Sequence, residues 1–154
     1  MTIRPVQLTL IALGVAGPIV AAAPDALAQT PLKAIFDKYQ LLGTFAADCG
    51  RPASDDNFYF VNRLLNDGAV ERDQMSGPTK RDWVVFLDKA SELKPNEIAV
   101  SGTRDGKPTD GVWRVDGTRM LQVEANWDGK KYVGNGHLLQ NGAEMPWLNR
   151  CGGN

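Results

Sequence analysis

The sequence predicts an all-β fold: an antiparallel up-and-down meander of about eight strands closed into a barrel, with one short N-terminal helix and one disulfide. Three observations lead to this prediction. From Gly43 onward apolar and polar residues alternate, which is typical of antiparallel strands with one solvated face. Asp-Gly and Asn-Gly pairs separate these segments and favour tight hairpins. The two cysteines, Cys49 and Cys151, bracket nearly all of this region.

Residues 1–28 have the organisation of a secretory signal peptide. Arg4 precedes the apolar stretch Val6–Val20, and residues 26–28 (Ala-Leu-Ala) fit the A-x-A cleavage pattern. This stretch is shorter than the roughly 20 residues that a membrane-spanning helix needs, so a cleaved leader is expected rather than an uncleaved anchor. We therefore expect a single β-barrel domain over 29–154, exported by a Sec-type route to the periplasm or the medium, with no membrane span in its mature form.

One helix is expected at the start of this domain. Pro31 suits a first helical turn and Gly43 suits the residue after the last one. Between them apolar residues recur at helical spacing, and these residues are Leu32, Ile35, Phe36, Tyr39 and Leu42. We expect this apolar stripe to pack at the mouth of the barrel; a lid or plug over a cavity is the alternative.

Eight segments of alternating polarity follow the helix. They are Thr44–Cys49, Asn57–Leu65, Ala69–Met75, Arg81–Lys89, Glu97–Thr103, Val112–Asp116, Arg119–Trp127 and Lys131–Gln140. Turn signals occur at 66–68, 76–78, 94–96, 105–106, 110–111, 116–117, 128–129 and 141–142. Because the turns are short, each strand is expected to pair with its neighbour in the sequence.

The two ends of such a meander remain unpaired edges unless the sheet closes. In an exported protein a Cys49–Cys151 disulfide is the default, and it joins the first strand to the tail beyond the last strand. We expect an irregular tail held back by this bond, with Trp147 sealing the base of the barrel. Closure into a barrel needs the two ends to meet in this way. A β-sandwich is the alternative fold, and free or intermolecular thiols are the alternative state of the cysteines.

A resemblance accompanies this architecture. Gly43-Thr44-Phe45, after a helical turn and at the head of an eight-strand meander, resembles the G-x-W opening of the lipocalin (calycin) superfamily, with Phe45 at the position of the Trp. Arg150 is the candidate for the late arginine that packs on the Trp in that family. The resemblance implies a barrel that holds a ligand. Small secreted bacterial barrels that inhibit lysozyme or metalloproteases are similar in size and disulfide use.

Large aromatic residues come from many of the expected strands. They would either fill a small barrel or line a pocket for an apolar ligand. His137 is the only histidine of the chain and is either a polar member of such a site or a hydrogen-bonded strand residue. The candidate ligand-binding residues are Phe45, Phe58, Phe60, Trp83, Trp113, Trp127, Tyr132 and His137.

Composition and motifs argue against several other functions. The formal net charge of −1 provides no basic field for nucleic acid. The serines lack a nucleophile-elbow context, and the acidic residues between Asp48 and Asp56 lack the ligand spacing of a calcium loop and are expected to form turns. We expect no enzyme activity, metal or cofactor. Gly102, Gly134 and Gly136 are expected at bulges or bends of the strands, or where a ligand needs room.

Two functions fit these observations. The first is a secreted or periplasmic binding protein that holds a small apolar or amphipathic ligand inside the barrel. The alternative is a secreted inhibitor or interaction protein that binds a protein target through the loops of a plugged barrel. A hollow, aromatic-lined interior would favour the first, and a filled interior with an exposed apolar patch would favour the second.

Overall fold

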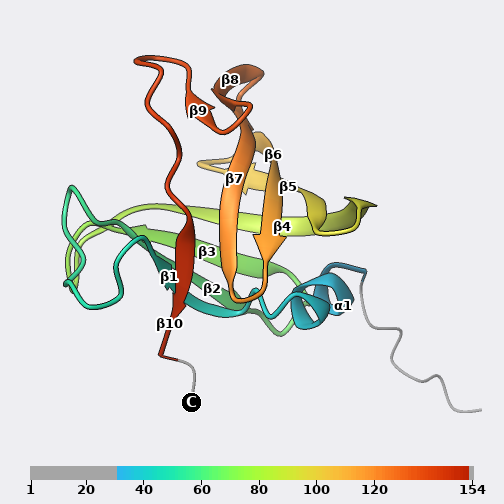
Figure 1. Ribbon diagram of the computed structural model, residues 1–154. Coiled ribbons are helices and arrows are strands. Elements are labelled where there is room, and N and C mark those ends of the chain that lie inside the picture. The colour runs from blue at the N-terminus through green and yellow to red at the C-terminus, as the bar shows by residue number, and fades with distance from the viewer. Residues whose placement is uncertain (1–30, 153–154) are drawn as a thin grey trace, which may run out of the picture.

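The computed structural model describes residues 31–152, so the expected leader over 1–28 lies outside the described residues. One helix, α1 (Pro31–Lys38), precedes ten strands in a single antiparallel sheet (Figure 1). The strands are β1 (Gly43–Ala46), β2 (Tyr59–Leu64), β3 (Val70–Met75), β4 (Arg81–Lys94), β5 (Glu97–Arg104), β6 (Lys107–Asp116), β7 (Arg119–Trp127), β8 (Lys130–Gly134), β9 (His137–Leu138) and β10 (Leu148–Cys151).

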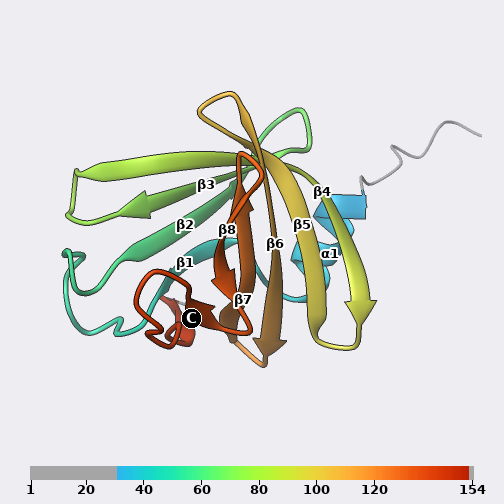
Figure 2. The ribbon, with the colours of Figure 1, turned by 90° about the horizontal axis from the view of Figure 1, so that it is seen from above.

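The sheet closes into the predicted eight-stranded barrel. Strands β1 to β7 pair in sequence order around the ring (Figure 2). Strand β10 returns to lie between β1 and β7 (Figure 1). Phe45 of β1 lies opposite Arg150 of β10, and Met120 of β7 lies opposite Leu148. The expected irregular tail is therefore wrong: the tail forms the closing strand, because its backbone groups satisfy both edges of the meander.

The expected single strand over 131–140 is also wrong. Asn135 and Gly136 both have positive φ, 52° and 77°, as a tight type I′ hairpin turn requires. The chain folds back at this turn, and Gly134 pairs with His137. Strands β8 and β9 consequently stand out from the ring at the end of the barrel away from α1 (Figure 1).

The disulfide between Cys49 and Cys151 is confirmed, with a Cα–Cα distance of 5.3 Å. It ties the loop after β1 to the end of β10, across 102 positions of sequence. The side chain of Asn149 reinforces this contact, because its Nδ2 donates a hydrogen bond of 3.0 Å to the carbonyl of Ala47. The bond thus fixes the strand that completes the ring.

Helix α1 fills one end of the barrel. Leu32 and Phe36, one turn apart, are both buried and share one face of the helix. The helix ends in a Schellman motif: Gln40 has φ 51°, its N–H donates to the carbonyl of Asp37, and the N–H of Leu41 donates to the carbonyl of Phe36. The packing role expected for this helix is confirmed, and the helix also plugs that end of the ring. No helix within residues 31–152 has the length and apolar character needed to cross a membrane.

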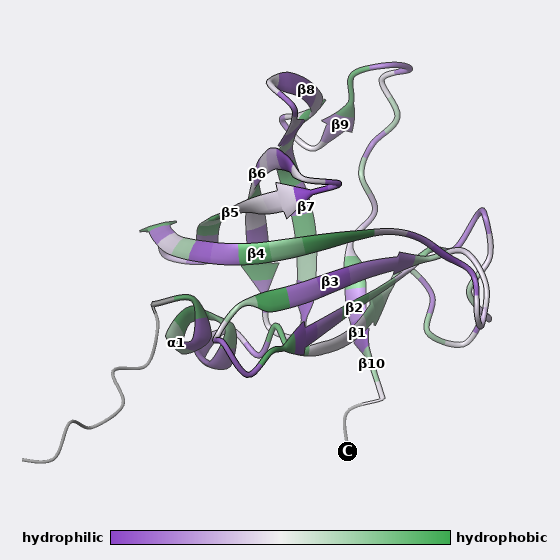
Figure 3. Cartoon of the chain, turned by 180° about the vertical axis from the view of Figure 1, so that it is seen from behind, coloured by the Kyte–Doolittle hydropathy of each residue, from purple (hydrophilic) through white to green (hydrophobic). Residues whose placement is uncertain are grey.

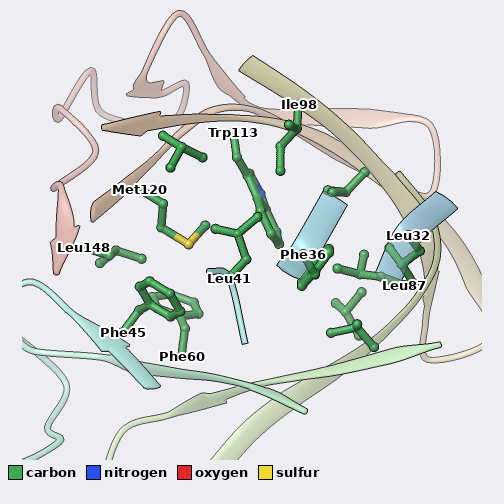
Figure 4. Close-up of a cluster of buried hydrophobic side chains, with 14 residues drawn as sticks. Leu32, Phe36, Leu41, Phe45, Phe60, Leu87, Ile98, Trp113, Met120 and Leu148 are labelled. Carbon is green, nitrogen blue, oxygen red and sulfur yellow. The ribbon is translucent and has the colours of Figure 1, made fainter. Parts of the chain in front are cut away.

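A core of buried side chains lies between this helix and the strands (Figure 4). Phe36 packs edge-on against Trp113 with ring centroids 5.9 Å apart. Apolar and polar residues alternate along the strands (Figure 3), so one side chain in two faces the interior. The buried apolar members of the core are Leu32, Phe36, Leu41, Phe45, Phe60, Val70, Val85, Leu87, Ile98, Val100, Trp113, Val115, Met120 and Leu148.

Two glycines of the meander allow backbones to approach closely. The expected turn at 110–111 is wrong: Gly111 lies inside β6, where a Cβ would be 2.7 Å from the carbonyl oxygen of Glu124. Gly102 lies on β5 opposite the register shift in β4 between Leu87 and Lys89, so the expected bulge at this glycine is confirmed. This bulge bends the long strand β4 around the barrel.

Replacing Gly102 with Ala is expected to lower the free energy of unfolding by about 1–3 kcal/mol. The new Cβ would lie 1.9 Å from the carbonyl oxygen of Phe86, so β4 and β5 must separate locally. Gly134→Ala is the matched control, because a Cβ there meets only the side chains of Leu139 and Lys131, at 3.4 Å or more. Urea unfolding of both variants measures the difference, and equal midpoints would contradict the expected clash.

Candidate functional site

The interior of the barrel is hollow at the end away from α1. A cavity of about 250 Å³, called here the inner cavity, lies between β2–β7 and the β8–β9 hairpin. It is lined by Phe60, Arg72, Gln74, Trp83, Val85, Leu87, Val100, Arg104, Thr109, Asp110, Gly111, Trp113, Gln122, Ala125, Asn126, Trp127, Tyr132, Val133, Leu138 and Met145. Apolar walls with a few polar groups are the usual composition of a small-molecule site.

Five of the eight predicted ligand-binding residues line the inner cavity. They are Phe60, Trp83, Trp113, Trp127 and Tyr132. They come from β2, β4, β6, β7 and β8, so the closure of the barrel brings together residues that are far apart in sequence.

The structure places the other three candidates elsewhere. Phe45 is 1% exposed and belongs to the packed core. Phe58 lines an adjoining side cavity of about 310 Å³, which shares Phe60 and Met145 with the inner cavity. His137 lies on the protruding hairpin, outside both cavities; its Nδ1 is 3.0 Å from the carbonyl of Asn135. The Asn-Gly turn before His137 carries it away from the ring of the barrel.

The floor of the inner cavity carries a buried arginine that the sequence analysis did not single out. Arg72 of β3 is 4% exposed, and its guanidinium lies between two aromatic rings, 4.4 Å from the centroid of Phe60 and 4.6 Å from that of Trp113. No carboxylate of residues 31–152 forms an ion pair with it, and its Nη2 has no hydrogen-bond partner among these residues. Burial lowers the pKa of Arg72 to about 9.

Asn62 orients this guanidinium. The Nη1 of Arg72 donates a hydrogen bond of 2.9 Å to Oδ1 of Asn62, and Nδ2 of Asn62 donates one of 2.7 Å to the carbonyl of Leu41. Both side chains are buried, and Leu41 lies just after the helix that plugs the barrel. The end of α1 therefore fixes the position of Arg72 through one intermediate side chain.

A second arginine lies nearer the mouth. Arg104, the last residue of β5, places its guanidinium 4.8 Å from the centroid of Trp83 and 4.6 Å from that of Trp127. Its Nε is buried without a hydrogen bond, although the carboxylate of Asp105 lies 3.6 Å away. This arginine thus has a nearby counter-charge, in contrast to Arg72.

The two arginines and four rings form one continuous column, the arginine–aromatic stack. The rings of Phe60 and Trp83 are 6.0 Å apart and join the floor to the mouth. In order, the stack consists of Trp113, Arg72, Phe60, Trp83, Arg104 and Trp127. Cations over aromatic faces stabilise such an arrangement by roughly 0.5–2 kcal/mol per contact.

A signal for Arg72 is present in the sequence. Residues two apart on a strand share a face, and Val70, Arg72 and Gln74 alternate with the two acidic residues Glu71 and Asp73 of the other face. Val70 is apolar and is expected to face the interior. Because Arg72 shares its face of the strand, the pattern predicts a charged side chain directed into the barrel. Arg104 gives no such signal, because it ends its strand next to a turn.

The other candidate features do not form a site. Asp55 and Asp56 form the expected turn, between Ser54 and Asn57, and they pair with Lys80 and Arg51 respectively. Within residues 31–152 no group of three or more metal-ligating side chains is gathered. An open depression of about 520 Å³ lies between α1 and β4–β6. It is larger than the inner cavity, but neither Arg72 nor Arg104, which carry the buried unpartnered polar atoms found among the described residues, lines it.

Comparison with known proteins returns no match: no family model, no curated protein and no solved structure is similar to this chain. The function is therefore inferred from the inner cavity and its polar groups alone.

Proposed function

We propose that this protein is an exported binding protein that holds a small amphipathic molecule inside its β-barrel. The observation that carries the proposal is the inner cavity, which is walled by aromatic side chains from five strands and blocked at one end by helix α1. The inner and side cavities adjoin through shared lining residues, and together they reach the range of about 300–1,000 Å³ typical of small-molecule sites.

The location forms part of this proposal. A disulfide is compatible with an oxidising compartment, and the leader expected over residues 1–28 is what export to the periplasm or the medium requires. A barrel built in this way would keep its ligand away from water outside the cytosol.

Kinship with the lipocalin superfamily is likewise a proposal. Its support is an eight-stranded ring with a short helix at one end and Gly43-Thr44-Phe45 at the start of the first strand. Arg150, the candidate for the late arginine, lies directly opposite Phe45 in the strand register. The alternative, an inhibitor built on a filled barrel, has less support because the interior contains a cavity.

The cavity is tested with an uncharged fluorescent probe, N-phenyl-1-naphthylamine, whose emission rises in an apolar site. Ala125 lies on the cavity wall, so Ala125→Phe is expected to fill the space and raise the Kd of the probe at least about tenfold. Thr118→Phe, in an exposed turn at the plugged end, is the control and should leave the Kd unchanged.

Either of two outcomes would count against the proposal. The probe fails to bind the unmodified protein, or both variants bind it equally well. Native mass spectrometry of the protein from its own host provides an independent check, in which a co-purifying small-molecule mass is expected.

A further inference from the structure

We propose that the ligand is a monocarboxylate, with its carboxylate bound by Arg72 at the floor of the inner cavity and its apolar part directed toward the mouth. This inference rests on the binding function proposed above and specifies the chemistry of its ligand. It is carried by Arg72, a buried cation that lines the cavity and has no anionic partner in residues 31–152.

The first step is the cost of the buried charge. Moving a charged group out of water costs several kcal/mol unless a counter-charge and hydrogen bonds compensate. Arg72 has one hydrogen bond to Asn62 and two aromatic neighbours, and none of these three is charged. The contacts recover part of the cost, and a carboxylate at Nη2 would supply the missing charge.

The second step is the geometry of the guanidinium. Phe60 and Trp113 cover its two faces, and Asn62 occupies Nη1. What remains is the in-plane edge that carries the unpartnered Nη2. Carboxylate oxygens bind guanidinium groups along this plane, so the arrangement leaves the edge that an anionic head group needs.

The third step is the number of charges. The second arginine of the cavity, Arg104, already has Asp105 at 3.6 Å. Among the described residues that line the inner cavity, Asp110 is the single acid, and its Oδ2 accepts a hydrogen bond of 2.6 Å from Asn126. Asp110 is exposed to water and forms no ion pair with Arg72, so its charge is largely screened from the floor. The buried guanidinium of Arg72 is thus one positive charge without a partner at the floor, which matches a head group with one negative charge.

The direction of the ligand follows from the walls. Val85 lies opposite Arg72 in the strand register, and Trp83 lies two residues further toward the mouth. The helix side is closed by the packed core, to which Leu87 belongs. An apolar chain attached to the carboxylate has room only toward Trp127 and Tyr132 at the open end. The ligand is thus expected to enter with its charged group first.

The experiment compares two ligands that differ in charge but not in chain length: decanoate and 1-decanol, each displacing N-phenyl-1-naphthylamine at pH 7.5. In the unmodified protein decanoate is expected to bind at least about tenfold more tightly than decanol, because only decanoate forms the charge-assisted hydrogen bond. Arg72→Met is expected to remove this preference, with the affinity for decanol retained. Arg119→Met is the control, since Arg119, the first residue of β7, pairs with Asp116 on the exposed surface and does not line the inner cavity.

The outcomes separate the two proposals. Equal displacement by decanoate and decanol in the unmodified protein overturns the monocarboxylate and leaves the binding function standing. A preference for decanoate that persists in Arg72→Met also overturns it. Absence of probe binding to the unmodified protein contradicts the binding function itself. If Arg72→Met does not fold, Arg72→Lys replaces it, because lysine keeps the positive charge but lacks Nη2. This variant is expected to prefer decanoate over decanol less strongly than the unmodified protein. An unchanged affinity of Arg72→Lys for decanoate would contradict binding of the carboxylate by Nη2.

Discussion

Replacing Cys49 and Cys151 together with serine is expected to lower the free energy of unfolding by about 2–5 kcal/mol. The disulfide closes a loop of 102 positions, so its loss increases the entropy of the unfolded chain. It also anchors β10, which pairs with only three residues of β1 and two of β7. Without the bond this short strand is expected to fray, and the ring opens where it closes the sheet.

Urea unfolding of the double variant measures this loss, with binding of N-phenyl-1-naphthylamine as the readout of an intact barrel. Both cysteines are replaced together because a single substitution leaves a reactive thiol. Reduction of the unmodified protein with dithiothreitol is the matched control and should give the same midpoint. A change in unfolding free energy below about 1 kcal/mol would show that β10 holds without the bond.

Replacing Phe36 with Ala is expected to lower the free energy of unfolding by about 3–5 kcal/mol. Phe36 is 0% exposed and packs edge-on against Trp113, 5.9 Å away between ring centroids. Its removal leaves a void between α1 and the strands, and the neighbouring side chains are expected to close it only in part. Because Trp113 also contacts Arg72, the floor of the inner cavity loses part of its support.

Ile35→Ala is the comparison for this prediction. Ile35 is the neighbouring residue of α1 and is only partly buried, so its truncation should cost clearly less, about 1 kcal/mol. Thermal unfolding of both variants gives the two values. Equal losses would mean that α1 is not fixed through Phe36, and the helix would then be a loosely attached cover rather than a plug.

Local patterns identified most of the meander. The turn signals at 94–96, 105–106, 116–117 and 128–129 all fall between paired strands, because Gly, Asn and Asp adopt the required positive φ at little cost. The same reasoning failed at 110–111, where Gly111 lets β6 and β7 approach each other. The sequence does not distinguish a glycine that is needed for the positive φ of a turn from one that is needed where a neighbouring strand comes too close for a Cβ.

The candidate site was likewise predicted in part by local patterns and decided in part by contacts in the fold. Aromatic residues on several strands indicated a lined interior, and five of them do line the inner cavity. His137 does not line this cavity, because its place depends on the turn at Asn135-Gly136. Arg72 was missed, although alternation along its strand places it on the same inward face as Val70. Alternation assigns a residue to a face of the sheet, but it does not show whether a buried charge has a partner.

The sequence by itself determined the strand class, the order of pairing and the disulfide that holds the ends, because backbone conformation at turns and alternation along strands are local properties. The tertiary structure decided which strand closes the ring and which end is filled and which is hollow. It also decided that Arg72 lies at the floor of the hollow part with no counter-charge from residues 31–152. These features depend on contacts between residues that are far apart in the chain, and only the folded barrel brings those residues together.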